Sequence, residues 1–160
     1  MAIKKRIETT SIGVIDKILT GVAGEYYVAA ELSRHGYVAS LTSKNTKGID
    51  CLASNQEGSK TVSIQIKTKS KGRGWVLNAS CYKHNPNLFY VFVALEDSKV
   101  PEYYIVDSAH VSASIKSDYD VWFETSRKDG NEHNVTSIRK FYMTDEEKIA
   151  YYNAWNLLGL

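Results

Sequence analysis

The sequence predicts an α/β fold in which a mixed β-sheet is flanked by helices. Three observations carry this prediction. Near the start, apolar residues recur at steps of three and four, which is typical of an amphipathic helix. The segments 49–54 and 61–68 have strand character and are joined by a polar turn at 55–59, which indicates a hairpin. The run 88–95, L-F-Y-V-F-V-A-L, is apolar without alternation, which marks a strand covered on both faces.

The first helical pattern spans residues 11–35, as one helix or two short ones, and Gly36 is placed to end it. Gly21 and Gly24 weaken the helix and allow another part of the backbone to approach closely. Glu25 falls within the apolar stripe, where a charge should be paired or bound to metal; the plainer alternatives are a salt bridge to Lys67 or a position at the edge of the stripe. The predicted stripe is Ile15, Leu19, Val22, Glu25, Ala29 and Leu32.

The hairpin carries the candidate site. In the strand 61–68 successive side chains point to opposite faces, so Gln65 and Lys67 share one polar face while the apolar residues share the other. On the partner strand, Asp50 sits inside an apolar run, where an ionised carboxylate needs a cation or several donors. Asp50, Gln65 and Lys67 are therefore expected to converge on one spot.

The remaining elements are predicted from shorter patterns. Ser108 can cap a short helix that reaches residue 115, and the polar stretch 118–134 is typical of a loop or an irregular hairpin. Thr144 and Glu147 form a capping box that opens a C-terminal helix. That helix is expected to carry Ile149, Tyr152, Trp155 and Leu158, and further strands are expected at 37–42, 75–77, 103–106 and 135–142.

A carboxylate, a second oxygen ligand on the adjoining strand and a lysine two residues further on suit metal-assisted attack on a phosphodiester. Oxygen ligands hold Mg²⁺, and the metal neutralises charge that builds on the phosphate. An ammonium group stabilises the same charge or positions the attacking water. The hairpin therefore indicates phosphodiester hydrolysis as a candidate activity.

The motifs G-E-Y-Y-V-A-A-E-L-S-R-H-G-Y, I-D-C and I-Q-I-K follow one another in an order that resembles the PD-(D/E)XK nuclease superfamily. Their spacing is similar to that of archaeal-type Holliday junction resolvases and small restriction-endonuclease-like proteins. The resemblance, which covers roughly the first half of the chain, implies a restriction-endonuclease-like fold, and the length of 160 residues indicates a single domain over residues 1–160. It also implies that Glu25, Asp50 and Lys67 are the family's catalytic acidic residues and lysine, and that Glu25 and Asp50 bind Mg²⁺ or Mn²⁺.

Gln65 departs from the family pattern, which usually has Asp or Glu at this place. An amide offers a metal only a neutral carbonyl oxygen, so Gln65 and the backbone carbonyl of Ile66 are the expected additional ligands. With one carboxylate gone, the pocket has two formal negative charges, which weakens capture of a divalent ion. The alternative function is therefore a non-catalytic DNA-binding or interaction module that retains the nuclease fold.

Positive charge is concentrated on the hairpin. Seven basic and two acidic residues lie between positions 43 and 75, a local charge of +5 in a chain whose net charge is +2, so the remainder carries −3. This distribution favours DNA as a partner, with Lys47, Lys69, Lys71 and Arg73 as the predicted phosphate contacts. The plainer interpretation is that these lysines decorate solvated strand ends and that 70–74 is only a turn. A homodimer is implied by the resemblance, with a monomer or a subunit as alternatives.

Several other classes are disfavoured. The four histidines have no metal-ligand spacing with one another or with Cys51 and Cys81, and no P-loop or dinucleotide fingerprint occurs. The two cysteines are expected to be free, buried thiols. The first ten residues hold a basic cluster without the apolar run of a signal peptide, and no stretch could span a bilayer, so a cytoplasmic location is expected.

Overall fold

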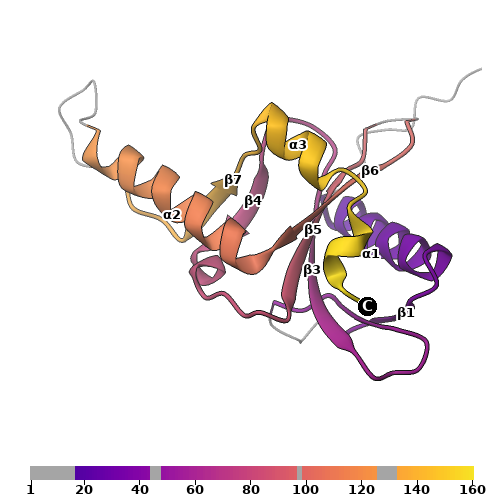
Figure 1. The fold of residues 1–160 in the computed structure, drawn as a ribbon. Helices are drawn as coiled ribbons and strands as arrows, with labels where there is room; N and C mark the ends of the chain where they lie inside the picture. The colour runs from indigo at the N-terminus through magenta and orange to yellow at the C-terminus, as the bar shows by residue number, and fades with distance from the viewer. Residues whose placement is uncertain (1–16, 44–47, 97–98, 126–132) are drawn as a thin grey trace, which may run out of the picture.

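The computed structural model describes residues 17–43, 48–96, 99–125 and 133–160. Its elements begin with one helix, continue with a run of strands and end with helices and a further strand (Figure 1). In sequence they are α1 (Lys17–Arg34), β1 (Val38–Leu41), β2 (Cys51–Ser54), β3 (Thr61–Lys69), β4 (Trp75–Asn78), the 3-10 helix η1 (Ala79–Tyr82), β5 (Leu88–Ala94), β6 (Glu102–Asp107), α2 (Ser108–Glu124), β7 (Ile138–Phe141), α3 (Asp145–Tyr151) and the 3-10 helix η2 (Trp155–Leu158).

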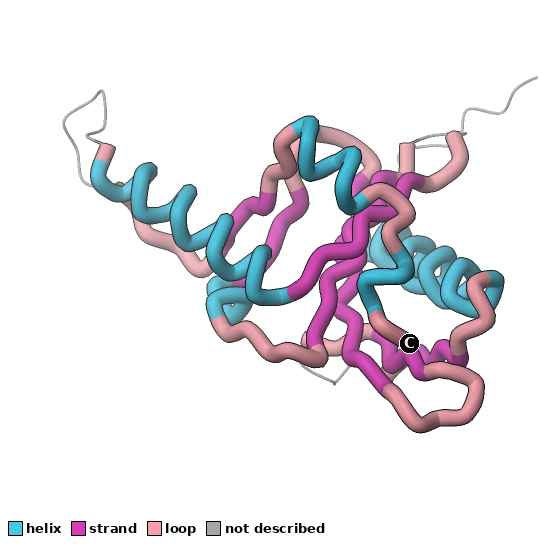
Figure 2. The backbone as a smooth tube through the Cα atoms, in the orientation of Figure 1, coloured by secondary structure: helices cyan, strands magenta, loops and turns pink. Residues whose placement is uncertain are grey.

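The main sheet has five strands in the order β1-β2-β3-β5-β6. Strands β3 and β5 are parallel, and the other neighbours are antiparallel, so the sheet is mixed as predicted. Strands β4 and β7 form a separate antiparallel pair. The predicted hairpin is confirmed: β2 and β3 pair with Cys51 opposite Ile64, and the connecting turn follows Ser54 (Figure 2).

Both faces of the main sheet are covered. On one face, α1 and the C-terminal segment bury a cluster that includes Leu32, Ile64 and Trp155. On the other face, α2 and the β4–β7 pair bury a second cluster around Phe92 and Phe141, whose stacked rings lie 4.6 Å apart (Figure 1). Strand β5 contributes to both clusters and has a strand on each side. The prediction of a doubly covered strand at 88–95 is therefore confirmed.

Helix α1 confirms the predicted helix but buries a different face. Its buried positions are Thr20, Gly24, Val28 and Leu32, whereas Leu19 is 59% exposed, so the predicted stripe was wrong in phase. The cause is Gly24: a Cβ atom there would lie 1.8 Å from Thr68 Oγ1, so the helix packs on β3 through the residue without a side chain. Glu25 consequently lies on a flank of the helix rather than at the centre of its buried face. Ile15 lies outside the described residues.

Helix α1 ends as predicted. Gly36 adopts a φ of +82°, in the left-handed region that glycine favours, and the Tyr37 N–H donates to the Leu32 carbonyl at 3.0 Å. Strands β1, β4 and β6 match the segments predicted for them to within one residue at each end, and β7 occupies 138–141 of the predicted 135–142. None of the helices in the described ranges is both long enough and apolar enough to cross a membrane. Cys51 and Cys81 are free and buried, as expected.

Helix α2 is longer than predicted. It continues to Glu124, so the expected loop at 118–134 is wrong for its first part, and residues 126–132 lie outside the described ranges. Its N-cap is Asp107, which accepts from the His110 N–H at 2.8 Å, because the Ser108 hydroxyl is engaged by the Asn85 backbone. The charges misled the prediction: Lys116 and Asp120 form a 2.9 Å ion pair on the exposed side of a continuous helix.

The C-terminal helix begins at the predicted capping box of Thr144 and Glu147 but is shorter than expected. It stops at Tyr151 because Asn153 takes a left-handed φ of 50° and donates its N–H to the Tyr103 carbonyl at 2.8 Å, which ties the chain to β6. The prediction of one helix through Leu158 is therefore wrong, and Ile149 is 82% exposed. Trp155 and Leu158 are nevertheless buried, from the 3-10 helix η2.

Candidate active site

Asp50 lies at the point where β2 begins and is fixed by three hydrogen bonds. Gly48 precedes it with a φ of +74°, a turn conformation that suits glycine. The Asp50 N–H donates to the Ile64 carbonyl at 2.9 Å, and its carbonyl accepts from Thr42 at 3.0 Å. Its carboxylate Oδ2 accepts from the Ile66 N–H at 2.7 Å. The carboxylate therefore satisfies a β3 backbone donor that lies just past the first residue of β2.

The backbone of β3 also directs a carbonyl oxygen, that of Ile66, toward the space beside Asp50. The Ser63 N–H donates to Asn87 on the β5 side, whereas Ile64 and Ile66 engage Asp50 on the β2 side. Because the N–H and C=O of one strand residue point to the same side, the Ile66 carbonyl points past the end of β2, beside Asp50. A carboxylate and a backbone carbonyl oxygen thus lie near each other where β2 begins beside β3.

Gln65 and Lys67 share one face of β3, as the alternation predicted, and they stand in register with Tyr90 and Phe92 of β5. Both are half-buried. The side chain of Lys67 forms no hydrogen bond or ion pair with another described residue, so its ammonium is available. Gln65 opens onto a cavity of about 660 Å³ whose polar wall consists of Ser63, Gln65, Asn78, Ser80, Lys83 and Asn85.

The charge of Asp50 acts on buried neighbours. Burial raises the pKa of Tyr90 to about 12, and the charges of Cys81 and Asp50 add to this effect. Burial also raises the pKa of the Cys51 thiol to about 11, again with a contribution from Asp50. Both groups are therefore neutral near pH 7, and Cys51 does not offer a thiolate. The ligand atoms at this edge are oxygens.

Glu25 lies on the flank of α1 opposite Tyr27. Tyr27 and Glu31 act on the pKa of Tyr103 in β6, so that flank of the helix faces the β6 side of the sheet. Helical geometry places Glu25 about 160° around the axis from Tyr27, on the opposite flank. It follows Gly24, which contacts Thr68 two residues beyond Ile66. Glu25 is half-buried and engaged in an interaction of its own.

Within the described ranges, no three His, Cys, Asp or Glu side chains gather closely enough to hold a metal ion. Gln65 is part of the reason, since an acidic residue there would stand beside Asp50. The structure thus brings Asp50, Ile66, Gln65 and Lys67 to one stretch of the hairpin. The convergence of Glu25 with them stays a prediction.

The predicted phosphate contacts differ in their surroundings. Lys69 donates to the Arg73 carbonyl at 3.0 Å and lies 3.8 Å above the Trp75 ring, and burial lowers its pKa. These two contacts of Lys69 hold the loop 70–74 beside the start of β4. Lys71 and Arg73 project from that loop and are exposed. Lys47 lies outside the described residues.

The architecture is that of the restriction-endonuclease-like fold of PD-(D/E)XK nucleases: a mixed sheet with the candidate residues on its central hairpin and α1 across one face. The structure is similar to a bacterial homing endonuclease, I-Ssp6803I, with a TM-score of 0.51 and 16% identity over 89% of this chain and 90% of that one. It is also similar to Archaeoglobus fulgidus Hjc, a Holliday junction resolvase from an archaeal hyperthermophile, with a TM-score of 0.51 and 11% identity over 87% of this chain and 95% of that one. At these identities the likeness shows the fold.

The sequence matches no protein-family model and no curated protein. The fold predicted from the motif order is nevertheless confirmed by the two structures.

Sequence reasoning missed the amide-rich wall of the cavity at Gln65. Asn78 ends β4 and caps η1, and Asn85 lies in the loop after η1, so both are distant in sequence from the hairpin strand that carries Gln65. The available signal was the density of Asn and Ser between positions 78 and 87. Asn78 is visible as a cap, since its side chain accepts from the Ser80 N–H at 3.1 Å.

Proposed function

We propose that this protein is a divalent-metal-dependent endonuclease that hydrolyses DNA phosphodiester bonds at the edge formed by β2 and β3. The observation that carries the proposal is the Asp50 carboxylate, held by the Ile66 N–H at 2.7 Å beside the Ile66 carbonyl, with Lys67 on the same strand. The similarity to a homing endonuclease and a Holliday junction resolvase supports a nucleic-acid substrate. A branched DNA or a restriction-type substrate is compatible with these two neighbours.

The donor set at this edge suits a hard cation. It consists of the Asp50 carboxylate, the Ile66 carbonyl and the Gln65 amide oxygen, with Glu25 as the proposed second carboxylate. Cys51 stays protonated and does not compete for the metal. Such residues would hold Mg²⁺ or Mn²⁺, which supplies charge neutralisation on the phosphate and a more acidic water.

Lys67 has the role of a positive charge at the reacting phosphate. Its ammonium stabilises charge that develops on the phosphate oxygens or orients the attacking water. Lys71 and Arg73 hold the DNA backbone from the exposed loop. A homodimer with two such sites and a cytoplasmic location stay predictions of the resemblance and of the sequence.

The test is cleavage of supercoiled plasmid and of four-way DNA junctions, each with Mg²⁺, with Mn²⁺ and with a chelator. We expect metal-dependent cutting that falls about a hundredfold in Lys67→Ala, because one stabilising charge is lost. Lys60→Ala is a matched control: it removes a lysine at the far end of the same hairpin, where Nζ donates to the Gly159 carbonyl. Tight DNA binding without cutting in either metal would instead favour the non-catalytic binding module.

Gln65→Glu tests whether this side chain belongs to the metal site. A third carboxylate should strengthen divalent-metal binding by about tenfold, because the added charge favours a cation that dehydrates reluctantly. Isothermal titration with Mn²⁺ measures this change. Asn78→Asp, on the wall of the same cavity, is the control for a general increase in negative charge. An unchanged affinity in Gln65→Glu would place the side chain outside the metal site, on the substrate side of the cavity.

A further inference from the structure

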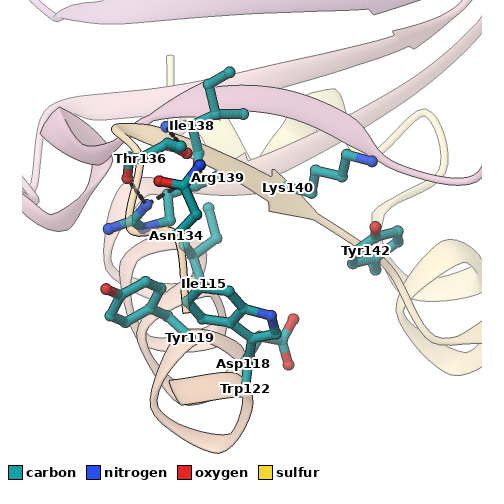
Figure 3. Close-up of a pocket in the computed structure, with 10 residues that line it drawn as sticks. All are labelled: Ile115, Asp118, Tyr119, Trp122, Asn134, Thr136, Ile138, Arg139, Lys140 and Tyr142. Carbon is teal, nitrogen blue, oxygen red and sulfur yellow. Dashed lines mark hydrogen bonds between the residues drawn. The ribbon is translucent and has the colours of Figure 1, made fainter. Parts of the chain in front are cut away.

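A second cavity lies between α2 and β7 (Figure 3). It shares no lining residue with the cavity at Gln65. It has a volume of about 420 Å³, which is within the range of small-ligand sites. Helix α2 lines it with Ile115, Tyr119 and Trp122. These residues are four and three positions apart, so they share one face of the helix. Strand β7 and the residues beside it form the opposite wall. We call this cavity the α2–β7 pocket.

The helix wall of the α2–β7 pocket is aromatic. Trp122 is 42% exposed, and its ring centroid lies 5.5 Å from that of Tyr119. Ile115, which is 1% exposed, closes the base of the pocket. Partly exposed aromatic rings over an apolar floor are surfaces on which a planar ring stacks.

The strand wall carries fixed positive charge. The Arg139 guanidinium lies 4.0 Å from the Tyr119 ring centre and donates from Nη1 to the carbonyls of Thr136 and Ile138, at 2.6 and 2.9 Å. Lys140 is exposed beside it. The lining contains one acidic residue, Asp118, against these two cations, so the pocket favours a ligand with an anionic group.

The free edge of β7 adds backbone hydrogen-bonding groups. The Ala79 N–H donates to the Ser137 carbonyl at 2.8 Å, so residue 137 faces β4. Because antiparallel strands alternate, the N–H and C=O of Ile138 and Lys140 point away from β4. Arg139 covers the Ile138 carbonyl. The backbone groups of Lys140 therefore border the pocket and can pair with the polar edge of a ring.

One end of the α2–β7 pocket lies against the basic loop 70–74. Tyr142 lines its far end, and a Cβ atom on Gly74 would lie 2.7 Å from the Tyr142 ring, so the ring rests on the loop 70–74. Lys71 and Arg73 project from that loop.

We propose that the α2–β7 pocket binds a nucleotide, with the base stacked on Trp122 and Tyr119 and the phosphate beside Lys140. The base comes from an unpaired position of bound DNA, or the ligand is a free nucleotide. An unpaired base of bound DNA as the ligand rests on the proposed function. Stacking of a base on the aromatic wall and pairing of a phosphate with Lys140 do not depend on it.

The test uses two probes in the presence of a chelator, so that cleavage plays no part: a DNA duplex with one unpaired 2-aminopurine, and dAMP. We expect the unpaired-base duplex to bind more tightly than its fully paired counterpart, with a change in 2-aminopurine fluorescence on stacking. Trp122→Ala should weaken binding of the unpaired-base duplex about tenfold, because one stacking contact is lost. Trp122→Phe should retain most of the affinity.

Phe123→Ala is the matched control, since it removes an aromatic ring that is 54% exposed on the same helix but does not line the pocket. Binding of dAMP alone, without a preference for the unpaired-base duplex, supports the free-nucleotide source. Equal affinity of wild type and Trp122→Ala for both probes, or an equal loss in Phe123→Ala, overturns the proposal. If the Lys67→Ala protein still binds the unpaired-base duplex and neither the wild type nor any variant cuts DNA with any metal, the pocket proposal stands. The proposed nuclease activity is then contradicted.

Discussion

Replacing Asp50 by Asn is expected to lower metal-dependent DNA cleavage about a thousandfold while leaving the stability of the protein close to that of wild type. The amide keeps an oxygen that can accept from the Ile66 N–H, which Asp50 Oδ2 now engages at 2.7 Å. It loses the negative charge with which the proposed site attracts a divalent cation. The substitution therefore separates the structural task of this side chain from its chemical one.

Asp50→Ala is the companion variant. It removes the acceptor as well as the charge, so the half-buried Ile66 N–H loses its partner, at a cost of about 1–3 kcal/mol in the free energy of unfolding. Cleavage rates on plasmid DNA and urea denaturation, measured on the same preparations, give the two effects. Full cleavage activity in a stable Asp50→Asn protein would contradict the proposed site, because the carboxylate would then serve only to hold the strand.

The same residue shows why the hairpin could be predicted. The alternation of a strand is fixed by backbone geometry, so the sequence alone placed Gln65 and Lys67 on one face. Asp50 was conspicuous as a carboxylate in an apolar run, and that mismatch is resolved by the Ile66 N–H. The acceptor role itself could not be predicted, because it depends on β2 beginning at Cys51, two residues after the start of the predicted strand 49–54.

Tertiary packing decided the features that the sequence did not predict. The apolar pattern predicts that Leu19 faces the core and gives Gly24 no part in packing. In the structure α1 packs on β3 at Gly24, because this residue has no side chain to keep the two elements apart. The charges between 116 and 120 suggested a loop, although they form the exposed side of a helix whose other side carries Tyr119 and Trp122. The aromatic wall of the α2–β7 pocket was missed with that helix, and the spacing of Ile115, Tyr119 and Trp122 was its visible signal.

Gly24→Ala and Gly21→Ala are expected to change stability in opposite directions. At Gly24 a Cβ atom would meet Thr68 Oγ1 at 1.8 Å and Thr68 Cβ at 2.9 Å, so the helix must move away from β3. We expect the free energy of unfolding to fall by about 1–3 kcal/mol, in spite of alanine's better helix propensity. At Gly21 nothing lies within 4 Å, so alanine should raise it by about 0.5–1 kcal/mol.

Urea denaturation of both variants measures this contrast, and a Thr68→Ala background identifies its cause. Thr68 Oγ1 is buried and has no hydrogen-bond partner in the described part of the chain, so removing it sacrifices no such bond. In that background Gly24→Ala should recover part of its loss, because only the Cβ contact at 2.9 Å remains. If both glycine variants stabilise the protein, α1 does not rest on β3 through Gly24. Glu25, the next residue, would then lose the geometric argument that turns it toward Asp50, and with it the proposed second carboxylate of the metal site.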